Sequence, residues 1–120
     1  MDDMRLYHVV GPGYEDGEPI YTFEELLEAG VVEARDWKWL RDRAGTADLT
    51  NEEATPYLLD TDFVSVFETL EDAEESQRLY GGRILTVVIP AVHVDRLGRN
   101  GEGYRDWYGR VPAEFVVQEV

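Results

Sequence analysis

The apolar residues of the chain fall into short runs that have the pattern of β-strands. Residues 83–89 form a continuous, β-branched apolar run that ends at Pro90, as expected for a strand buried on both faces. Residues 63–68 form a second run of β-branched and aromatic residues, and residues 5–10 form a third, which the following Gly-Pro-Gly breaks. We predict strands at these three places, and a closing strand that begins at Glu114.

Two segments carry the start and stop signals of helices. Thr22 is a candidate N-cap, followed by acids that suit the helix dipole, and Gly30 is a candidate stop. A second segment begins in the same way at Thr69 and ends before two glycines. Each segment places apolar residues at the three- and four-residue spacing of one helix face. We therefore predict helices over residues 22–30 and 69–80.

Three further segments are less regular. Residues 36–41 hold two tryptophans two positions apart, which would share one face of a strand but lie on different sides of a helix. We expect a short helix or an irregular segment there, with the tryptophans packed over the edge of the core. The polar residues 45–55 and the glycine-rich residues 98–109 are expected to be loops. The order of elements predicts an α+β fold with a mixed or largely antiparallel sheet and two to three helices.

The composition is that of one globular domain spanning residues 1–120, since 43% of the residues are hydrophobic and 12% aromatic. The chain has no cysteine, which excludes disulfides and thiolate metal sites. No apolar stretch approaches the roughly 20 residues of a membrane span. The acidic N-terminus does not resemble a signal peptide, so we expect a cytoplasmic protein with no membrane association.

The charge is strongly acidic, with a formal net value of −15. Such a chain is repelled by nucleic-acid phosphates, which disfavours direct DNA or RNA binding, although a local patch of arginines would still hold a small anion. Three explanations remain open: adaptation to high salt or to an arginine-preferring genome, general solubility, and mimicry of a nucleic acid by an acidic surface.

Most catalytic motifs are absent from the sequence. The two histidines, His8 and His93, lack metal-ligand spacing, and the Gly-Pro-Gly after the first strand lacks the lysine of a phosphate-binding loop. No metal site is predicted. The remaining candidates are the imidazole of His8, inside the first strand, and the carboxylate of Glu114, at the start of the last. We expect these two groups to meet in one cleft.

Three segments carry a resemblance to a known family. Residues 6–10 (Leu-Tyr-His-Val-Val), residues 63–69 with the helix that follows them, and residues 114–117 (Glu-Phe-Val-Val) are similar in order and spacing to motifs of the ADP-ribosyltransferase-like fold. The relevant branch is the histidine–tyrosine–glutamate branch, shared by diphtheria-type toxins and poly-ADP-ribose polymerases. The resemblance implies a split sheet that holds NAD in a cleft between its two halves.

The resemblance also implies roles for individual residues. His8 would donate a hydrogen bond to a ribose hydroxyl of NAD, and the backbone of Val9 would hold the carboxamide. Glu114 would bind the 2′-hydroxyl of the nicotinamide ribose and stabilise the oxocarbenium-like state as nicotinamide departs. The implied ring-stacking residues are Tyr80 or Phe67, with Tyr7 lining the pocket, and the implied pyrophosphate ligands are Arg5, Arg83 or Arg43.

Two departures from the family pattern keep a second hypothesis open. Val9 and Val10 replace the small residues that usually follow the histidine, and Phe67 or Val66 stands where a tyrosine is expected. The first hypothesis is an NAD-consuming transferase or glycohydrolase, such as a small toxin, that transfers ADP-ribose to a macromolecular acceptor or to water. The second is a non-catalytic nucleotide- or protein-binding module on the same scaffold. The third is an acidic interaction or mimic protein.

Overall fold

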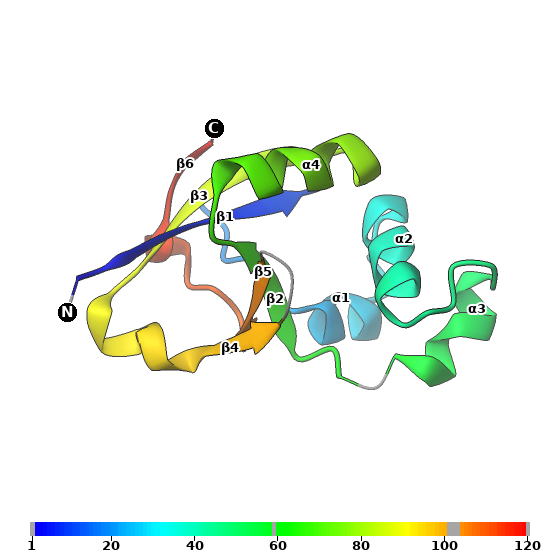
Figure 1. The fold of residues 1–120 in the computed structure, drawn as a ribbon. Coiled ribbons are helices and arrows are strands. Elements are labelled where there is room, and N and C mark those ends of the chain that lie inside the picture. Colours follow the sequence, from blue (N-terminus) through cyan, green and yellow to red (C-terminus); the bar gives the residue numbers. More distant parts are fainter. Residues whose placement is uncertain (1, 59, 101–103, 120) are drawn as a thin grey trace.

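The computed structural model describes residues 2–58, 60–100 and 104–119 and has an α+β fold built on one antiparallel sheet (Figure 1). The described strands lie in the order β4-β5-β2-β1-β3-β6. They are β1 (Met4–Val10), β2 (Phe63–Phe67), β3 (Arg83–Ile89), β4 (Leu97–Asn100), β5 (Tyr104–Tyr108) and β6 (Val116–Glu119). The helices are α1 (Phe23–Ala29), α2 (Ala34–Arg43), α3 (Asn51–Ala54) and α4 (Leu70–Tyr80), with 3₁₀ turns at Thr55–Tyr57, Ala91–Arg96 and Ala113–Phe115. No helix in this part of the chain is long and apolar enough to cross a membrane.

The sheet is divided between β1 and β2. β1 pairs with β3 at all seven of its residues, and β2 pairs with β5 at all five of its residues. Within the described residues, β1 and β2 pair with each other at one register position, Tyr7 opposite Phe67. The sheet therefore has two halves, β4-β5-β2 and β1-β3-β6, which diverge from this contact (Figure 1).

The largest buried cluster lies on the face of the sheet opposite α4. Leu6 and Val10 of β1 are buried there with Val64 of β2 and Trp107 of β5. Val9 faces the other side, because successive strand residues alternate, and it shares a second buried cluster with residues of α4. Both β1 and β2 are thus covered on both faces along much of their length, which explains their nearly continuous apolar sequences.

Aromatic rings join α1 and α2 to β2. Phe23 of α1 stacks on Trp39 of α2, with ring centroids 5.3 Å apart and planes inclined by 12°. Phe63 of β2 meets Phe23 edge-on at 5.1 Å. The short helix expected around residues 36–41 is confirmed as part of α2, and Trp39 packs at the edge of the core.

The main elements predicted from the sequence are confirmed. The strands expected at residues 5–10, 63–68 and 83–89 and the helices expected at residues 22–30 and 69–80 match β1, β2, β3, α1 and α4 within about two residues at each end. Both helices begin at the predicted N-cap threonines, whose hydroxyls accept the backbone N–H three residues further on. The predicted antiparallel character of the sheet is also confirmed.

Three predictions are wrong. The loop expected at residues 45–55 contains α3, so the described residues hold four α-helices instead of two or three. The loop expected at residues 98–109 contains β5 and most of β4; residues 101–103 of it lie outside the described residues. β5 has no β-branched residue, and its pairing along the whole of β2 holds it as a strand. The closing strand starts at Val116, because Glu114 lies in a 3₁₀ turn.

Candidate functional site

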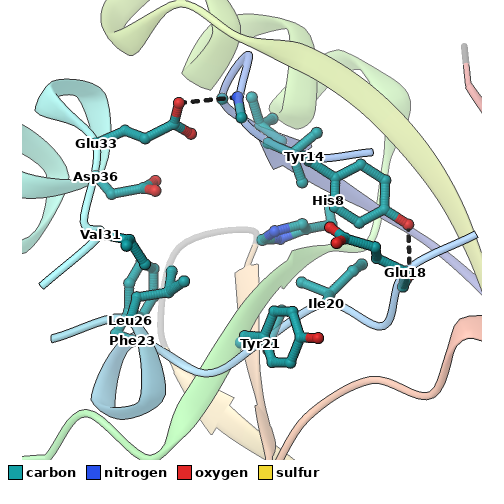
Figure 2. Close-up of a pocket in the computed structure, with 15 residues that line it drawn as sticks. His8, Tyr14, Glu18, Ile20, Tyr21, Phe23, Leu26, Val31, Glu33 and Asp36 are labelled. Atoms are coloured by element: carbon teal, nitrogen blue, oxygen red, sulfur yellow. Dashed lines mark hydrogen bonds between the residues drawn. The ribbon is translucent and has the colours of Figure 1, made fainter. Parts of the chain in front are cut away.

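A cavity of about 410 Å³ opens beside the division of the sheet. Its walls come from β1, from the loop that follows β1, from α1 and from the start of α2 (Figure 2). The loop is fixed at its far end, where Ile20 and Val111 exchange two backbone hydrogen bonds of 2.9 Å. Val64 of β2 completes the lining, so both halves of the sheet contribute to the same cavity. The volume lies within the range of small-molecule sites.

His8 lies in this cavity with one ring nitrogen engaged. Its Nδ1 lies 2.6 Å from the backbone oxygen of Ser65 on β2. A carbonyl oxygen only accepts, so Nδ1 carries the proton and donates. Burial lowers the pKa of His8 to about 4, and the Arg35 charge lowers it as well, against the opposing effect of the Ser65 hydrogen bond. The ring is therefore neutral at pH 7, and Nε2 carries a lone pair.

This tautomer reverses the expected role of His8. The resemblance implies a donor to a ribose hydroxyl, whereas the Nδ1 hydrogen bond leaves Nε2 as an acceptor at neutral pH. Among the described residues Nε2 has no hydrogen-bonding partner. The imidazole is only 8% exposed and lies toward the middle of the cavity (Figure 2). A ligand in the cavity would meet it as a hydrogen-bond acceptor.

Three carboxylates line the cavity, and no Lys or Arg does so among the described residues. Glu33 accepts a hydrogen bond of 2.9 Å from the backbone N–H of Gly13. The Glu33 carboxylate also lies close to Gly11, where a Cβ would be 1.9 Å from a carboxylate oxygen, so a larger residue there would displace the Glu33 side chain. Glu18 lies near Tyr14, whose hydroxyl donates to the backbone oxygen of Glu18 at 2.7 Å.

Asp36 is the most deeply buried of these carboxylates and is 8% exposed. Its carboxylate pairs with the guanidinium of Arg35, which also donates to the backbone oxygen of Val9 on β1. Burial raises the pKa of Asp36 to about 6; the charge and hydrogen bond of Arg35 lower it, and the charge of Glu33 raises it further. Asp36 is therefore a carboxylate that changes charge just below neutral pH.

The raised pKa of Asp36 predicts a pH-dependent stability. Between the ordinary pKa of 3.8 and about 6 the folded state keeps the proton that the unfolded state has lost, so lowering the pH through this window stabilises the fold. In Asp36→Asn this contribution is absent. Denaturant unfolding of both proteins between about pH 4.5 and 7 should show the wild type gaining about 1–3 kcal/mol relative to the variant as the pH falls. A difference that does not change with pH would contradict the shift.

The structure brings together only part of the predicted set. His8 and Val9 line the cavity, whereas the other residues implied by the resemblance do not. Tyr7 and Phe67 pack in the cluster beneath α4. The hydroxyl of Tyr80 donates to Asp42 at 2.7 Å. Their side chains therefore belong to the α4 side of the sheet, where they meet neighbouring residues and do not reach this cavity.

The arginines and Glu114 also lie outside the lining. Arg5 is exposed on β1, and Arg43 forms an ion pair of 2.8 Å with Asp106 of β5. Arg83 lies behind the cavity wall, where it donates to the backbone oxygen of Tyr14 at 2.7 Å. Glu114 is exposed in the turn before β6, and β3 separates β6 from β1. The structure therefore places His8 in this cavity and Glu114 outside it, so the two groups do not meet there as expected.

The carboxylates of the lining were missed in the sequence. An acid in the first turn of a helix, such as Asp36, is the ordinary partner of the helix dipole, and nothing local marks it as buried. Glu18 and Glu33 were two of 26 acidic residues. The Gly-Pro-Gly after β1 was the available signal, since it marks a place where the backbone approaches another group closely.

No known protein family, curated protein or solved structure matches the chain.

Proposed function

We propose that this chain is an ADP-ribosyltransferase-like protein that binds NAD in the cavity beside His8, with the nicotinamide and its ribose innermost. The observation that supports this proposal is the position of the cavity. It lies where the two halves of the sheet divide, with the first-strand histidine on its wall, as the resemblance of the sequence implies. The reaction proposed is cleavage of the bond between nicotinamide and ribose, with transfer of ADP-ribose to a macromolecular acceptor or to water.

The lining suits the nicotinamide end of NAD better than the phosphates. Apolar and aromatic residues cover most of the walls, and His8 Nε2 is an unpaired acceptor to which a ribose hydroxyl can donate. The pyrophosphate is left for the outside of the cavity, because carboxylates line its inside. Arg35 and Arg83 donate to the backbone of the cavity-lining residues Val9 and Tyr14, so their guanidinium groups lie along the wall.

In this proposal the carboxylates of the lining, and not Glu114, stabilise the positive charge that develops as nicotinamide leaves. NAD supplies a carbon that becomes positively charged as nicotinamide leaves, and a fixed negative charge nearby stabilises that state. Asp36 is ionised above about pH 6 and is held in place by Arg35. His8 orients the ribose by accepting a hydroxyl hydrogen bond. Phe23 and Tyr21 supply ring surface for the base.

The test combines NAD binding by calorimetry with nicotinamide release by chromatography. We expect the wild type to bind NAD and His8→Ala to bind it at least about tenfold more weakly, since one buried hydrogen bond and part of the wall are lost. Asp36→Asn should lower nicotinamide release more than it lowers binding. Glu114→Gln is the control variant, because Glu114 lies outside the cavity, and it should behave as the wild type. Failure of the wild type to bind NAD at millimolar concentration would end the proposal.

A non-catalytic binding module is the second candidate, and one observation favours it: the exposed position of Glu114, away from the cavity. The same experiment separates the two candidates. NAD binding that depends on His8, together with nicotinamide release no faster than background, would favour the module. Release that is lost in Asp36→Asn would favour the enzyme.

A further inference from the structure

The polar side chains of the cavity are almost entirely hydrogen-bond acceptors. His8 presents the lone pair of Nε2, and ionised carboxylates accept but do not donate. The hydroxyl of Tyr14 is already donated to a backbone oxygen. Tyr21, at the exposed rim, is the lining side chain whose hydroxyl is left to donate. A ligand that matches this lining must therefore bring donors or positive charge of its own.

Nε2 of His8 also calls for a hydrogen-bond donor on the ligand, and it does so without any contribution from the acidic residues. His8 is 8% exposed, and its Nε2 meets no donor among the described residues but is not enclosed by protein atoms, so it is accessible from the cavity. An unpaired acceptor on a largely buried ring, open to a cavity, indicates a position at which a donor group of a ligand can bind.

The aromatic rings of the lining attract cations elsewhere in the same structure. The guanidinium of Arg83 lies 5.5 Å from the ring centroid of Tyr14, and that of Arg110 lies 5.0 Å from the ring centroid of Tyr21. Both rings line the cavity together with Phe23. Aromatic rings beside carboxylates form an environment that organic cations prefer.

We propose that the cavity selects a flat organic cation over a neutral molecule of the same shape. The natural occupant would be the positively charged nicotinamide ring of oxidised NAD, and this identification rests on the proposed function. The negative charges are those of Glu18, Glu33 and Asp36. The opposing charges are Arg35, paired with Asp36, and two guanidinium groups at the lining rings, Arg83 and Arg110, each of which pairs with a carboxylate of its own. Reduced NAD has a neutral nicotinamide ring, so the negative charges of the lining do not strengthen its binding.

The direct test compares two probes that differ in charge but have the same ring: 1-methylnicotinamide, a cation, and nicotinamide, which is neutral. Calorimetry at pH 7.5 should show the cation binding the wild type about tenfold or more tightly. Asp36→Asn and Glu18→Gln should each reduce this preference, and Glu114→Gln should leave it unchanged. Circular dichroism shows whether each variant is folded. Two variants on different elements keep the test valid if one of them fails to fold.

Cation binding should also release protons near pH 6. A positive charge beside Asp36 favours its ionised form, so binding at pH 6 should displace part of a proton and binding at pH 8 should displace almost none. Calorimetry in two buffers of different ionisation enthalpy measures this number. The effect should vanish in Asp36→Asn, whereas ring stacking alone would give no proton release in either protein.

The outcomes separate this inference from the proposed function. Preference for 1-methylnicotinamide without any NAD binding would support the cation site and remove the proposed function. Equal affinities for the two probes, or for oxidised and reduced NAD, would overturn the inference while leaving NAD binding in place. No binding of either probe at millimolar concentration would overturn the inference as well.

Discussion

Replacing Trp107 with alanine is expected to lower the free energy of unfolding by about 3–5 kcal/mol. Trp107 is fully buried on β5, in the core cluster between the two halves of the sheet. Its indole N–H donates to the backbone oxygen of Arg110 at 3.1 Å, and the guanidinium of Arg96 lies 4.4 Å from the ring centroid. Alanine would leave a large cavity and an unpaired carbonyl. A loss of this size is a large part of the stability of a small domain.

Urea denaturation followed by far-UV circular dichroism measures this loss without relying on tryptophan fluorescence. Trp107→Phe should lose clearly less than alanine, because it keeps most of the packing and forfeits mainly the hydrogen bond. Tyr57→Ala is the control, since Tyr57 is a large aromatic residue that is 59% exposed, and its removal should change stability by about 0.5 kcal/mol or less. A loss below about 1 kcal/mol for Trp107→Ala would mean that the two halves of the sheet do not share this core.

The position of Trp107 illustrates which elements the sequence predicts and which it does not. β3 is mostly β-branched, and β2 alternates valines with aromatic residues and a serine, so local preference and final structure agree in both strands. β5 reads Tyr-Arg-Asp-Trp-Tyr, and its glycine-rich flank and buried acid have the pattern of a loop. It becomes a strand through pairing with β2, about 40 residues earlier in the chain. Such a contact leaves no periodic signal in the segment itself.

The residues of the candidate site show the same contrast between local sequence signals and distant contacts. His8 was predicted, because a histidine inside an apolar strand stands out against its neighbours. Asp36 was not, because its position in the first turn of α2 is typical of a solvent-exposed acid. Its burial follows from the aromatic stack of Phe23 on Trp39, which brings α1 and α2 together. Glu114 shows the reverse error: a carboxylate at a strand entrance looked exceptional, but the turn around it leaves the side chain exposed.

The ion pair between Arg43 and Asp106 should give the second large effect. The terminal guanidinium nitrogens Nη1 and Nη2 of Arg43 donate to the carboxylate at 3.0 and 2.8 Å, and the guanidinium also lies 4.1 Å from the ring centroid of Phe63. The Asp106 side chain is 5% exposed. Arg43→Met would leave this buried carboxylate without its guanidinium, at an expected cost of about 3–5 kcal/mol. Arg110→Met is the control, because its pair with Glu25 is more exposed, and it should cost much less.

A double-mutant cycle separates the pair from the packing around it. Arg43→Met combined with Asp106→Leu should cost less than the sum of the two single changes by at least about 1 kcal/mol, because the buried charge is removed together with its partner. Additive costs would show that the pair contributes no coupling.

The cycle also tests how α2 is held: Arg43 ends the helix that carries Asp36, and its bonds to β5 anchor that helix to one half of the sheet. Arg35, beside Asp36, donates to the backbone of β1 in the other half. Since α2 links both halves across the cavity, single variants that stay folded should also lose part of the preference for 1-methylnicotinamide. The double variant should show this coupling in stability without recovering that preference, because leucine and methionine remove the buried charge together with its partner but do not restore the guanidinium contacts that fix α2.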